Sequence, residues 1–265
     1  MSTVARIRGA DLAYDVRGQG PPLLFLHAFP LGLVMWDPQA QAFAASHQVV
    51  RFDARGFGGS PPGDGLLTME RIADDAVALL DHLGLSRAVV CGLSMGGYAA
   101  FALVRRHADR LRGLVLADTR AGADSDAARA ARAAQADTAR KEGSAAVADA
   151  VLPKLVGETT HKRRPEIVAR LRETIAATPP RGIADALAGL AARADSTSTL
   201  REIRVPTLVL CGAEDVITPV AEAEALVRGI AGSRLEIVPE AGHLSSVENP
   251  EAFNNALGRF LEGLH

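Results

Sequence analysis

Short runs rich in Leu or Val recur along the chain, and each is followed within a few residues by Gly, Asp or His. The runs are residues 23–26, 49–52, 89–91, 114–117 and 207–211. Apolar runs of this length are typical of strands that are buried on both faces, as in a parallel sheet covered by helices. Residues 6–9 and 12–17 are joined by a short turn and instead predict an antiparallel hairpin that leads into the sheet.

Helical periodicity fills the stretches between these runs. Residues 68–85, 95–107 and 220–230 predict helices, the first of them with Thr68 as its N-cap and Gly84 as its stop. Strands that alternate with helices predict an α/β fold, with a mostly parallel central sheet and right-handed crossovers.

The strand pattern disappears between about residues 121 and 198. Ile167, Leu171 and Ile175 recur there at a four-residue spacing, which places them on one helical face. The breaks between helices are expected at Gly143, Pro153, Gly157, Pro165, Pro179 and Pro180. We predict that residues 121–198 form a helical lid inserted into the α/β core. An ordinary packed helical subdomain is the alternative.

Length and composition are those of a globular protein. The chain has 265 residues, of which 48% are hydrophobic and 23% charged. We assign residues 1–120 and 199–265 to the core. The 29 basic and 31 acidic side chains leave a net charge of −2, which gives no general attraction for nucleic acid or an acidic membrane surface. No apolar run approaches the roughly 18 residues of a membrane span, and the N-terminus has no signal-like apolar region. We therefore expect a cytoplasmic protein.

Ser94 lies in the sequence Gly-Leu-Ser-Met-Gly, directly after one predicted strand and directly before a predicted helix. That context is typical of a nucleophile elbow, a sharp turn that exposes a serine and allows only small flanking residues. The following helix points its N-terminus at the serine, where its dipole favours developing negative charge. A simple helix N-cap is the alternative role for Ser94.

A serine hydroxyl needs a base, and the base needs an orienting acid. Asp215 follows the strand at 207–211, and His243 lies in a loop after residues 235–238. Both therefore belong to the carboxyl edge of the sheet, where open α/β sheets bind their ligands. We predict Ser94 as nucleophile, His243 as base and Asp215 as acid. Asp118 and Glu214 are alternative acids.

Acyl transfer also needs two N–H donors for the tetrahedral oxyanion. We predict the backbone N–H groups of Met95, directly after the nucleophile, and of Phe29, in the loop after the strand at 23–26. His27 precedes Phe29 and is expected to support that loop rather than to act as a base.

These segments together resemble the serine α/β-hydrolases, and in particular the branch with small carboxylesterases, 3-oxoadipate enol-lactonase and the cofactor-free perhydrolases. The matching segments are residues 27–36, 53–60, 91–97, 209–219 and 242–250. The resemblance implies the α/β-hydrolase fold, the same three catalytic residues and the same two oxyanion donors. One departure is Ala28, where the family usually has Gly. A positive φ at Ala28 would store about 1 kcal/mol of strain.

Ester or lactone hydrolysis through an acyl-enzyme is the activity that these residues predict. The apolar residues Phe29, Trp36, Met95 and Leu244 indicate a small, mainly apolar acyl group, with Trp36 and Leu244 as candidate pocket residues. Trp36 packed beneath the lid is the alternative. A lactonase, a perhydrolase that uses hydrogen peroxide, and a non-catalytic ligand-binding protein are the other functions considered. The natural substrate and the oligomeric state are not predicted.

No cofactor and no metal are expected. The Gly-rich stretch at residues 56–59 follows a strand, but Pro61 and Pro62 prevent the immediate helix start that a dinucleotide site needs. Asp215 and His243 have no third partner at metal-ligand spacing. Two cysteines are too few for a disulfide framework, and Cys91 and Cys211 are expected to be buried thiols, with Cys91 as a remote alternative nucleophile.

Overall fold

An eight-stranded sheet organises residues 2–264, the part of the chain that the computed structural model describes. Its strand order is β1-β2-β4-β3-β5-β6-β7-β8. The strands are β1 (Thr3–Ile7), β2 (Ala10–Arg17), β3 (Pro22–Leu26), β4 (Gln48–Phe52), β5 (Ala88–Leu93), β6 (Leu111–Ala117), β7 (Thr207–Gly212) and β8 (Arg234–Val238). All neighbouring strands from β4 to β8 in this order are parallel, whereas β2 is antiparallel to β1 and to β4. The predicted mostly parallel sheet is confirmed.

The N-terminal hairpin is shifted from its predicted position. Its strands are Thr3–Ile7 and Ala10–Arg17, so residues 8 and 9 form the turn and not the end of a strand. The cause is local, because Arg8 and Gly9 both have positive φ angles, 49° and 75°, which a strand cannot contain.

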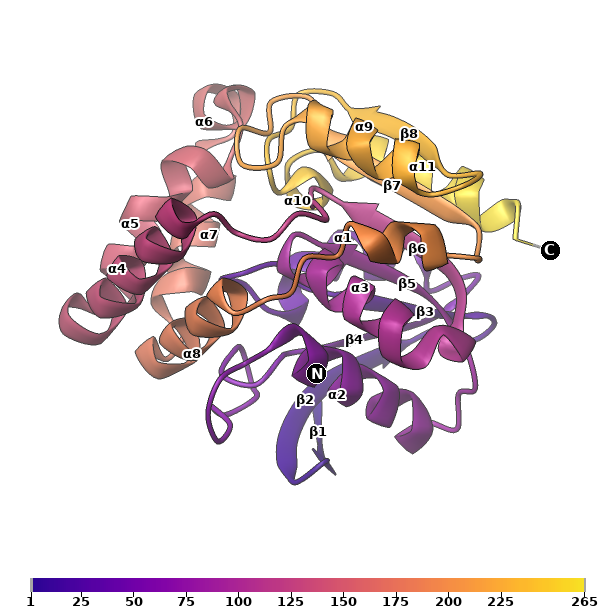
Figure 1. Cartoon of the computed structure of the whole chain (residues 1–265), viewed down its shortest axis with the longest axis horizontal. Coiled ribbons are helices and arrows are strands. Elements are labelled where there is room, and N and C mark those ends of the chain that lie inside the picture. Colours follow the sequence, from indigo (N-terminus) through magenta and orange to yellow (C-terminus); the bar gives the residue numbers. More distant parts are fainter. Residues whose placement is uncertain (1, 265) are drawn as a thin grey trace.

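Helices cover both faces of the sheet (Figure 1). The α-helices are α1 (Asp37–Phe43), α2 (Met69–His82), α3 (Met95–His107), α4 (Asp126–Glu142), α5 (Ser144–Leu155), α6 (Glu158–Arg163), α7 (Pro165–Ala176), α8 (Pro180–Ala191), α9 (Val220–Gly229), α10 (Ser245–Glu248) and α11 (Pro250–Glu262), and the 3₁₀ helices are η1 (Leu33–Trp36), η2 (Ala108–Arg110) and η3 (Ser198–Glu202). Side chains from α2, α3 and α9 pack on one face of the sheet, and those from α1 and α11 pack on the other. As predicted, the Thr68 side chain caps α2 by accepting from the Arg71 N–H.

Five helices, α4 to α8, lie between β6 and β7 in the chain and gather at one side of the sheet (Figure 1). Residues 121–198, which contain them, are called the helical insert below. Gly143, Gly157, Pro165 and Pro180 lie at helix boundaries as predicted, but α5 continues through Pro153 and ends two residues later. No helix within residues 2–264 combines the length and apolar character needed to cross a membrane.

Candidate active site

Ser94 occupies a strained turn between β5 and α3. Its backbone has φ 53° and ψ −109°, a conformation that costs an L-residue free energy. A Cβ atom on Gly92 would lie 2.3 Å from the Gly96 carbonyl oxygen, and one on Gly96 would lie 2.1 Å from that of Leu26. Glycine at both positions therefore permits the turn. The Ser94 side chain makes no capping hydrogen bond to α3, so the N-cap alternative does not describe it.

The three residues predicted as a triad lie in one hydrogen-bonded chain. His243 Nε2 is 2.8 Å from Ser94 Oγ, and His243 Nδ1 is 2.8 Å from Asp215 Oδ2. Because an ionised carboxylate only accepts hydrogen bonds, Nδ1 carries the proton and Nε2 is free to accept from the serine hydroxyl. His243 and Asp215 are almost fully buried, 2% and 5% exposed. Their mutual contact is thus shielded from solvent.

Asp215 is held by its own loop. Its carboxylate accepts from the backbone N–H groups of Ile217 and Thr218, at 2.8 and 2.9 Å, and from the Thr218 hydroxyl at 2.7 Å. Burial raises the pKa of the Asp215 carboxyl. The charge of His243 and the hydrogen bonds from His243 and Thr218 together lower it by more, so the pKa lies below its usual value. The group is ionised at neutral pH.

The alternative acid Asp118 does not contact His243. Its carboxyl group accepts a hydrogen bond from the Gly212 N–H at 2.8 Å and another from the Ser245 hydroxyl. Burial and the nearby charge of Asp215 hold the pKa of Asp118 well above its usual range. The Asp118 carboxyl is therefore a buried hydrogen-bonding support for the loops around β7 and α10.

Phe29 and Met95, the predicted oxyanion donors, both line the cavity that contains Ser94. Neither backbone N–H donates a hydrogen bond to another residue within 2–264, which leaves both free for a ligand. Ala28 does not have a positive φ angle, so the strain considered for that position is absent.

His27 supports this loop from beneath. Its Nε2 accepts from the Ala54 N–H at 3.0 Å, and its Nδ1 lies 3.0 Å from the Ala28 carbonyl oxygen. Burial lowers the pKa of His27, in keeping with a neutral ring that joins two loops. Asp53 adds to the same support by accepting from the Leu33 N–H at 2.6 Å.

A cavity of about 570 Å³ opens above Ser94 and His243. Most of its wall comes from α4 and α5 of the insert. Its lining residues are Phe29, Pro30, Ser94, Met95, Tyr98, Arg120, Ala128, Ala131, Arg132, Ala134, Gln135, Thr138, Ala150, Val151, Lys154, Leu155, Leu190, Ile217 and His243. The cavity is large enough for a small ester or lactone.

Two predicted pocket residues lie elsewhere. The Trp36 side chain is fully buried between Phe25 and Phe253, with ring centroids 4.6 and 6.0 Å away. Leu244 is also fully buried, and neither residue lines the cavity. The expectation for both is wrong because they belong to the apolar core between the sheet and α11, a packing relation that no local motif shows.

Apolar side chains make up most of the cavity lining, but one wall carries basic residues. Arg120, Arg132 and Lys154 line the cavity beside its alanines and leucines. Sequence reasoning missed them because it considered only charges near the motif segments, and these three residues are distant from every motif in the chain.

Glu214 and Glu248 were also missed as structural groups of the site. Glu248 is fully buried, and its carboxylate accepts from the N–H groups of Gly242 and Leu244, on either side of His243. The same carboxylate accepts from the Gly157 N–H at 2.8 Å, at the start of α6. Glu214, beside Asp215, accepts from the Thr159 N–H at 2.8 Å. Two carboxylates thus tie the insert to both loops that carry His243 and Asp215.

Asp118, Cys211 and Asp215 place ligand-type atoms within 4.8 Å of one another. The oxygens of both carboxyl groups already have hydrogen-bond partners in the surrounding loops. Burial raises the pKa of the Cys211 thiol, and it raises that of Cys91 well above the usual value. Both thiols are therefore protonated at neutral pH, which does not favour Cys91 as a nucleophile.

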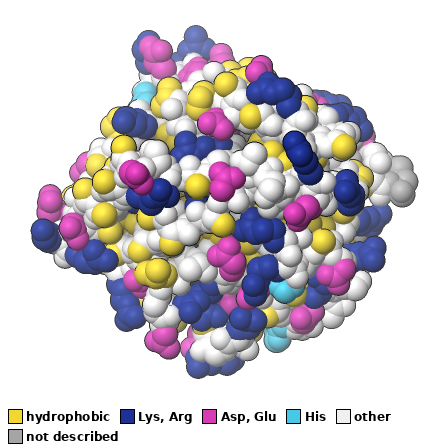
Figure 2. All heavy atoms as spheres, viewed as in Figure 1, with side chains coloured by type: hydrophobic (Ala, Val, Ile, Leu, Met, Phe, Trp, Pro, Cys, Tyr) yellow, Lys and Arg dark blue, Asp and Glu magenta, His cyan; other side chains and the backbone are white. Residues whose placement is uncertain are grey.

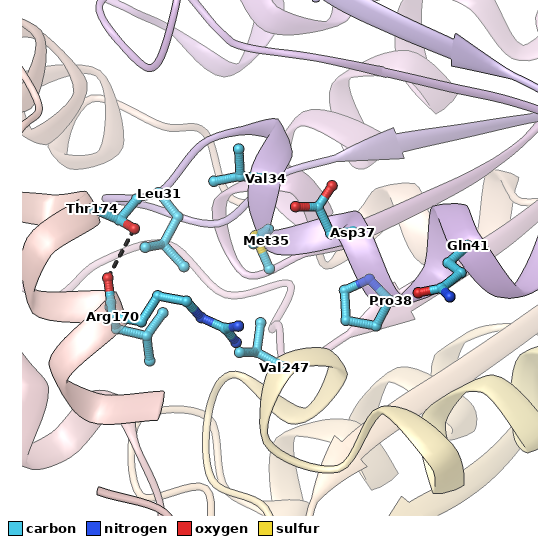
Figure 3. Close-up of a pocket in the computed structure, with 10 residues that line it drawn as sticks. Leu31, Val34, Met35, Asp37, Pro38, Gln41, Arg170, Thr174 and Val247 are labelled. Carbon is cyan, nitrogen blue, oxygen red and sulfur yellow. Dashed lines mark hydrogen bonds between the residues drawn. The ribbon is translucent and has the colours of Figure 1, made fainter. Parts of the chain in front are cut away.

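A second cavity of about 320 Å³ lies between the start of α1 and helix α7 (Figure 3). Leu31, Val34 and Met35 line it from the core, and Arg170 and Thr174 line it from the insert. None of the predicted catalytic residues reaches this cavity. It is a gap between insert and core that is separate from the site around Ser94.

A serine on a strand-to-helix elbow, hydrogen-bonded to a histidine and through it to an aspartate from later strand ends, in the chain order Ser, Asp, His, is typical of an α/β-hydrolase architecture. The comparison with protein families agrees: the profile of the α/β hydrolase fold matches residues 21–250, and the chain belongs to this family. The predicted resemblance and fold class are confirmed.

Individual relatives are similar over nearly the whole chain. The 3-oxoadipate enol-lactonase 2 of Acinetobacter baylyi is 34% identical and covers 93% of this chain and 91% of its own. A thermophilic esterase from Thermogutta terrifontis, solved with malate bound, superposes with a TM-score of 0.96 at 40% identity. The match covers 100% of this chain and 99% of the esterase chain. The enol-lactonase from Burkholderia xenovorans LB400 superposes with a TM-score of 0.92 at 34% identity, covering 98% and 100%.

Proposed function

We propose that this protein hydrolyses carboxylic esters or lactones through an acyl-enzyme formed on Ser94. The observation that carries the proposal is the chain of two 2.8 Å contacts from Ser94 through His243 to Asp215, with the serine open to a cavity. Similar chains named as an esterase and as enol-lactonases support the same bond type. Both substrate kinds present a carbonyl that a serine can attack.

The reaction begins when Ser94 Oγ attacks the scissile carbonyl carbon and His243 Nε2 takes the hydroxyl proton. Asp215 stabilises the imidazolium through the Nδ1 contact. His243 then protonates the leaving alkoxide, and the acyl group remains on Ser94. Water then attacks the acyl carbon while His243 removes its proton; the bond to Ser94 Oγ breaks, His243 returns the proton to Oγ, and the acid is released. In a lactone the alcohol stays tethered to the acyl group, so one hydroxy acid leaves.

The oxyanion of each tetrahedral intermediate is bound by the backbone N–H groups of Phe29 and Met95. Both donors lack a partner within residues 2–264, so binding the oxyanion breaks no existing hydrogen bond. Met95 is the first residue of α3, a helix of 13 residues whose N-terminus adds a favourable dipole.

The helical insert acts as a lid in this proposal. Helices α4 and α5 form most of the cavity wall but carry none of the proposed catalytic groups. A lid of this kind excludes water and shapes the acyl site, so the insert controls substrate choice while the core performs the chemistry.

Replacing Ser94 with Ala tests the proposal. We expect Ser94→Ala to lower kcat on nitrophenyl esters and on a panel of lactones by about 10³-fold or more, because the hydroxyl forms the covalent bond. Labelling by a serine-directed phosphonate should disappear in the same variant, while the unfolding transition should remain close to that of the wild type. Near-normal turnover by Ser94→Ala, or a wild-type burst without turnover, would contradict the proposal.

A further inference from the structure

The cavity above Ser94 has a cationic wall. Arg120 follows β6 in the core, Arg132 lies on α4, and Lys154 lies on α5. No Asp or Glu is among the cavity-lining residues of the described chain. Because the whole chain has a net charge of −2, this local excess of positive charge does not follow from composition.

One buried carboxylate organises the wall without neutralising it. Asp124, 3% exposed, accepts from Arg120 at 3.0 Å and from Arg193 at 2.9 Å, and it also accepts from Arg132 Nε. Burial raises the pKa of Asp124, but the hydrogen bond and charge of Arg132 and the charge of Arg193 lower it to about 2. At neutral pH the charge of Asp124 thus faces three guanidinium groups, and the carboxylates of Glu222 and Asp195 also act on Arg120 and on Arg193.

Arg193 lies behind this wall and not in the cavity. Its guanidinium carbon is 4.1 Å from the centre of the Tyr98 ring, and its side chain is 3% exposed. The Tyr98 face and Asp124 both contact the Arg193 guanidinium, whose buried Nε has no hydrogen-bond partner. The arginines that line the cavity are Arg120 and Arg132, and Lys154 adds a positive charge that has no ion pair within residues 2–264.

Several hydrogen-bond donors on these cavity-lining cations have no acceptor within residues 2–264. Within residues 2–264, the two terminal nitrogens of Arg132 and the Lys154 ammonium donate to no acceptor in side chain or backbone. The buried Nε of Arg120 also lacks a partner. An arginine whose Nε is fixed by a carboxylate presents its terminal nitrogens in a defined direction, which suits the recognition of a second carboxylate.

We propose that the cavity takes esters or lactones that carry a free carboxylate away from the scissile carbonyl, and that Arg132 and Lys154 bind this carboxylate. The inference rests on the proposed function, because it places the reacting carbonyl at Ser94 and the free carboxylate at the cationic wall. Hydrolysis would consume one water. An ester with the carboxylate on its acyl part would release a dicarboxylate and an alcohol, and a lactone with such a group would release one hydroxy-dicarboxylate.

Matched substrates test the proposal in two arms. The first compares 4-nitrophenyl esters of butyrate and longer fatty acids with the 4-nitrophenyl half-esters of succinate, glutarate and adipate. The second compares ethyl acetate with O-acetyl glycolate, which carries the carboxylate on the alcohol side. We expect kcat/KM of the wild type to be at least about tenfold higher for an anionic substrate than for its neutral counterpart in one arm, and this ratio to fall as salt rises.

Charge-removing variants connect the preference to the wall. We expect Arg132→Gln and Lys154→Gln each to lower the anionic-to-neutral ratio by about tenfold, as for loss of a charge-assisted hydrogen bond. Lys154 has no ion pair within residues 2–264, so its replacement keeps the test valid if loss of the Asp124 contact unfolds Arg132→Gln. Arg140→Gln is the matched control, since Arg140 lies on α4 outside this cavity and pairs with Asp137. It should leave the ratio unchanged.

A binding measurement separates this proposal from the proposed function. Calorimetry on Ser94→Ala should detect binding of glutarate or adipate but no binding of butyrate. Adding Lys154→Gln to the Ser94→Ala variant should weaken the binding of the dicarboxylates. If Ser94→Ala keeps its esterase activity, the acyl-enzyme proposal fails while the calorimetry still reports on the wall. A wild-type preference for the neutral substrate at every length and in both arms would overturn the carboxylate proposal, whatever the calorimetry shows.

Discussion

At the scale of single residues, the site depends on how the surroundings divide the roles of two buried carboxyl groups. Asp215 accepts from His243 and from its own loop, and its pKa is lowered, whereas Asp118 is buried without a cation in contact and its pKa is raised well above the usual range. The same side chain thus serves as a charged partner of His243 at one position and as a buried support of neighbouring loops at the other.

This difference predicts the outcome of two matched substitutions. Asp215→Asn should lower kcat/KM by about 10³- to 10⁴-fold, because an amide does not hold the imidazole in the required tautomer or stabilise the imidazolium. Asp118→Asn changes a group that does not contact His243 and should lower kcat/KM by less than about tenfold. Steady-state kinetics of both variants on one ester checks the prediction. The reverse order of the two losses would assign the acid to Asp118.

At the scale of elements, the insert is attached unevenly. Helix α8 meets the core backbone directly: a Cβ on Gly182 would lie 2.1 Å from the Gly56 carbonyl oxygen, and one on Gly189 would lie 1.9 Å from that of Leu67. Helix α6 is tied by Glu214 and Glu248 to the catalytic loops. The cavity face of α4 and α5 consists largely of small apolar residues. Substrate selection is therefore expected from α4 and α5.

A pair of insert variants tests this assignment. Val151→Ala enlarges the cavity from α5, so we expect kcat/KM to shift by several-fold towards longer or bulkier acyl groups. Leu171→Ala on α7 is the control, because Leu171 is 4% exposed but does not line the cavity above Ser94. It should lower the free energy of unfolding by about 2 kcal/mol or more and leave the preference among chain lengths unchanged. If Val151→Ala instead changed kcat/KM by the same factor for every ester, the insert would have a purely structural role.

At the scale of the whole molecule, charge is distributed locally. Acidic and basic side chains are interspersed over the face seen in Figure 2, in keeping with the net charge of −2. The attraction that we propose for an anionic substrate therefore arises inside the cavity and not from the overall field of the protein. Local charge also bears on the stability of the fold, because the buried Asp124 carboxylate pairs with three arginines.

Acid should weaken the fold through this cluster. The pKa of Asp124 is lowered to about 2 by Arg132 and Arg193, despite burial, which raises it. A lowered pKa contributes stability that is present above the unfolded-state pKa, near 3.8, and lost as the pH falls towards 2. We expect the free energy of unfolding to fall by about 1 kcal/mol from this group, with solvent screening allowed for, between about pH 4 and pH 2. Urea titrations of the wild type and of Asp124→Asn check this, because the variant should lack that part of the slope.

The sequence by itself determined the core fold and the position of the elbow at Ser94. Buried parallel strands leave continuous Leu and Val runs, and the turn at Ser94 needs glycines at fixed neighbouring positions, so both leave local signals that can be read in order along the chain. The hairpin boundary was misplaced because the positive φ of Arg8 has no strong sequence signal.

Only the tertiary structure decided what surrounds the reacting serine. Trp36 and Leu244 are close to motifs in sequence yet pack into the core, while Arg132 and Lys154 are far from every motif and line the cavity. A lining residue is defined by where helices of the insert settle on the core, and that depends on packing over long sequence separations. Local pattern determines the elbow and its fold, whereas the charge and shape of the cavity emerge only when distant segments meet.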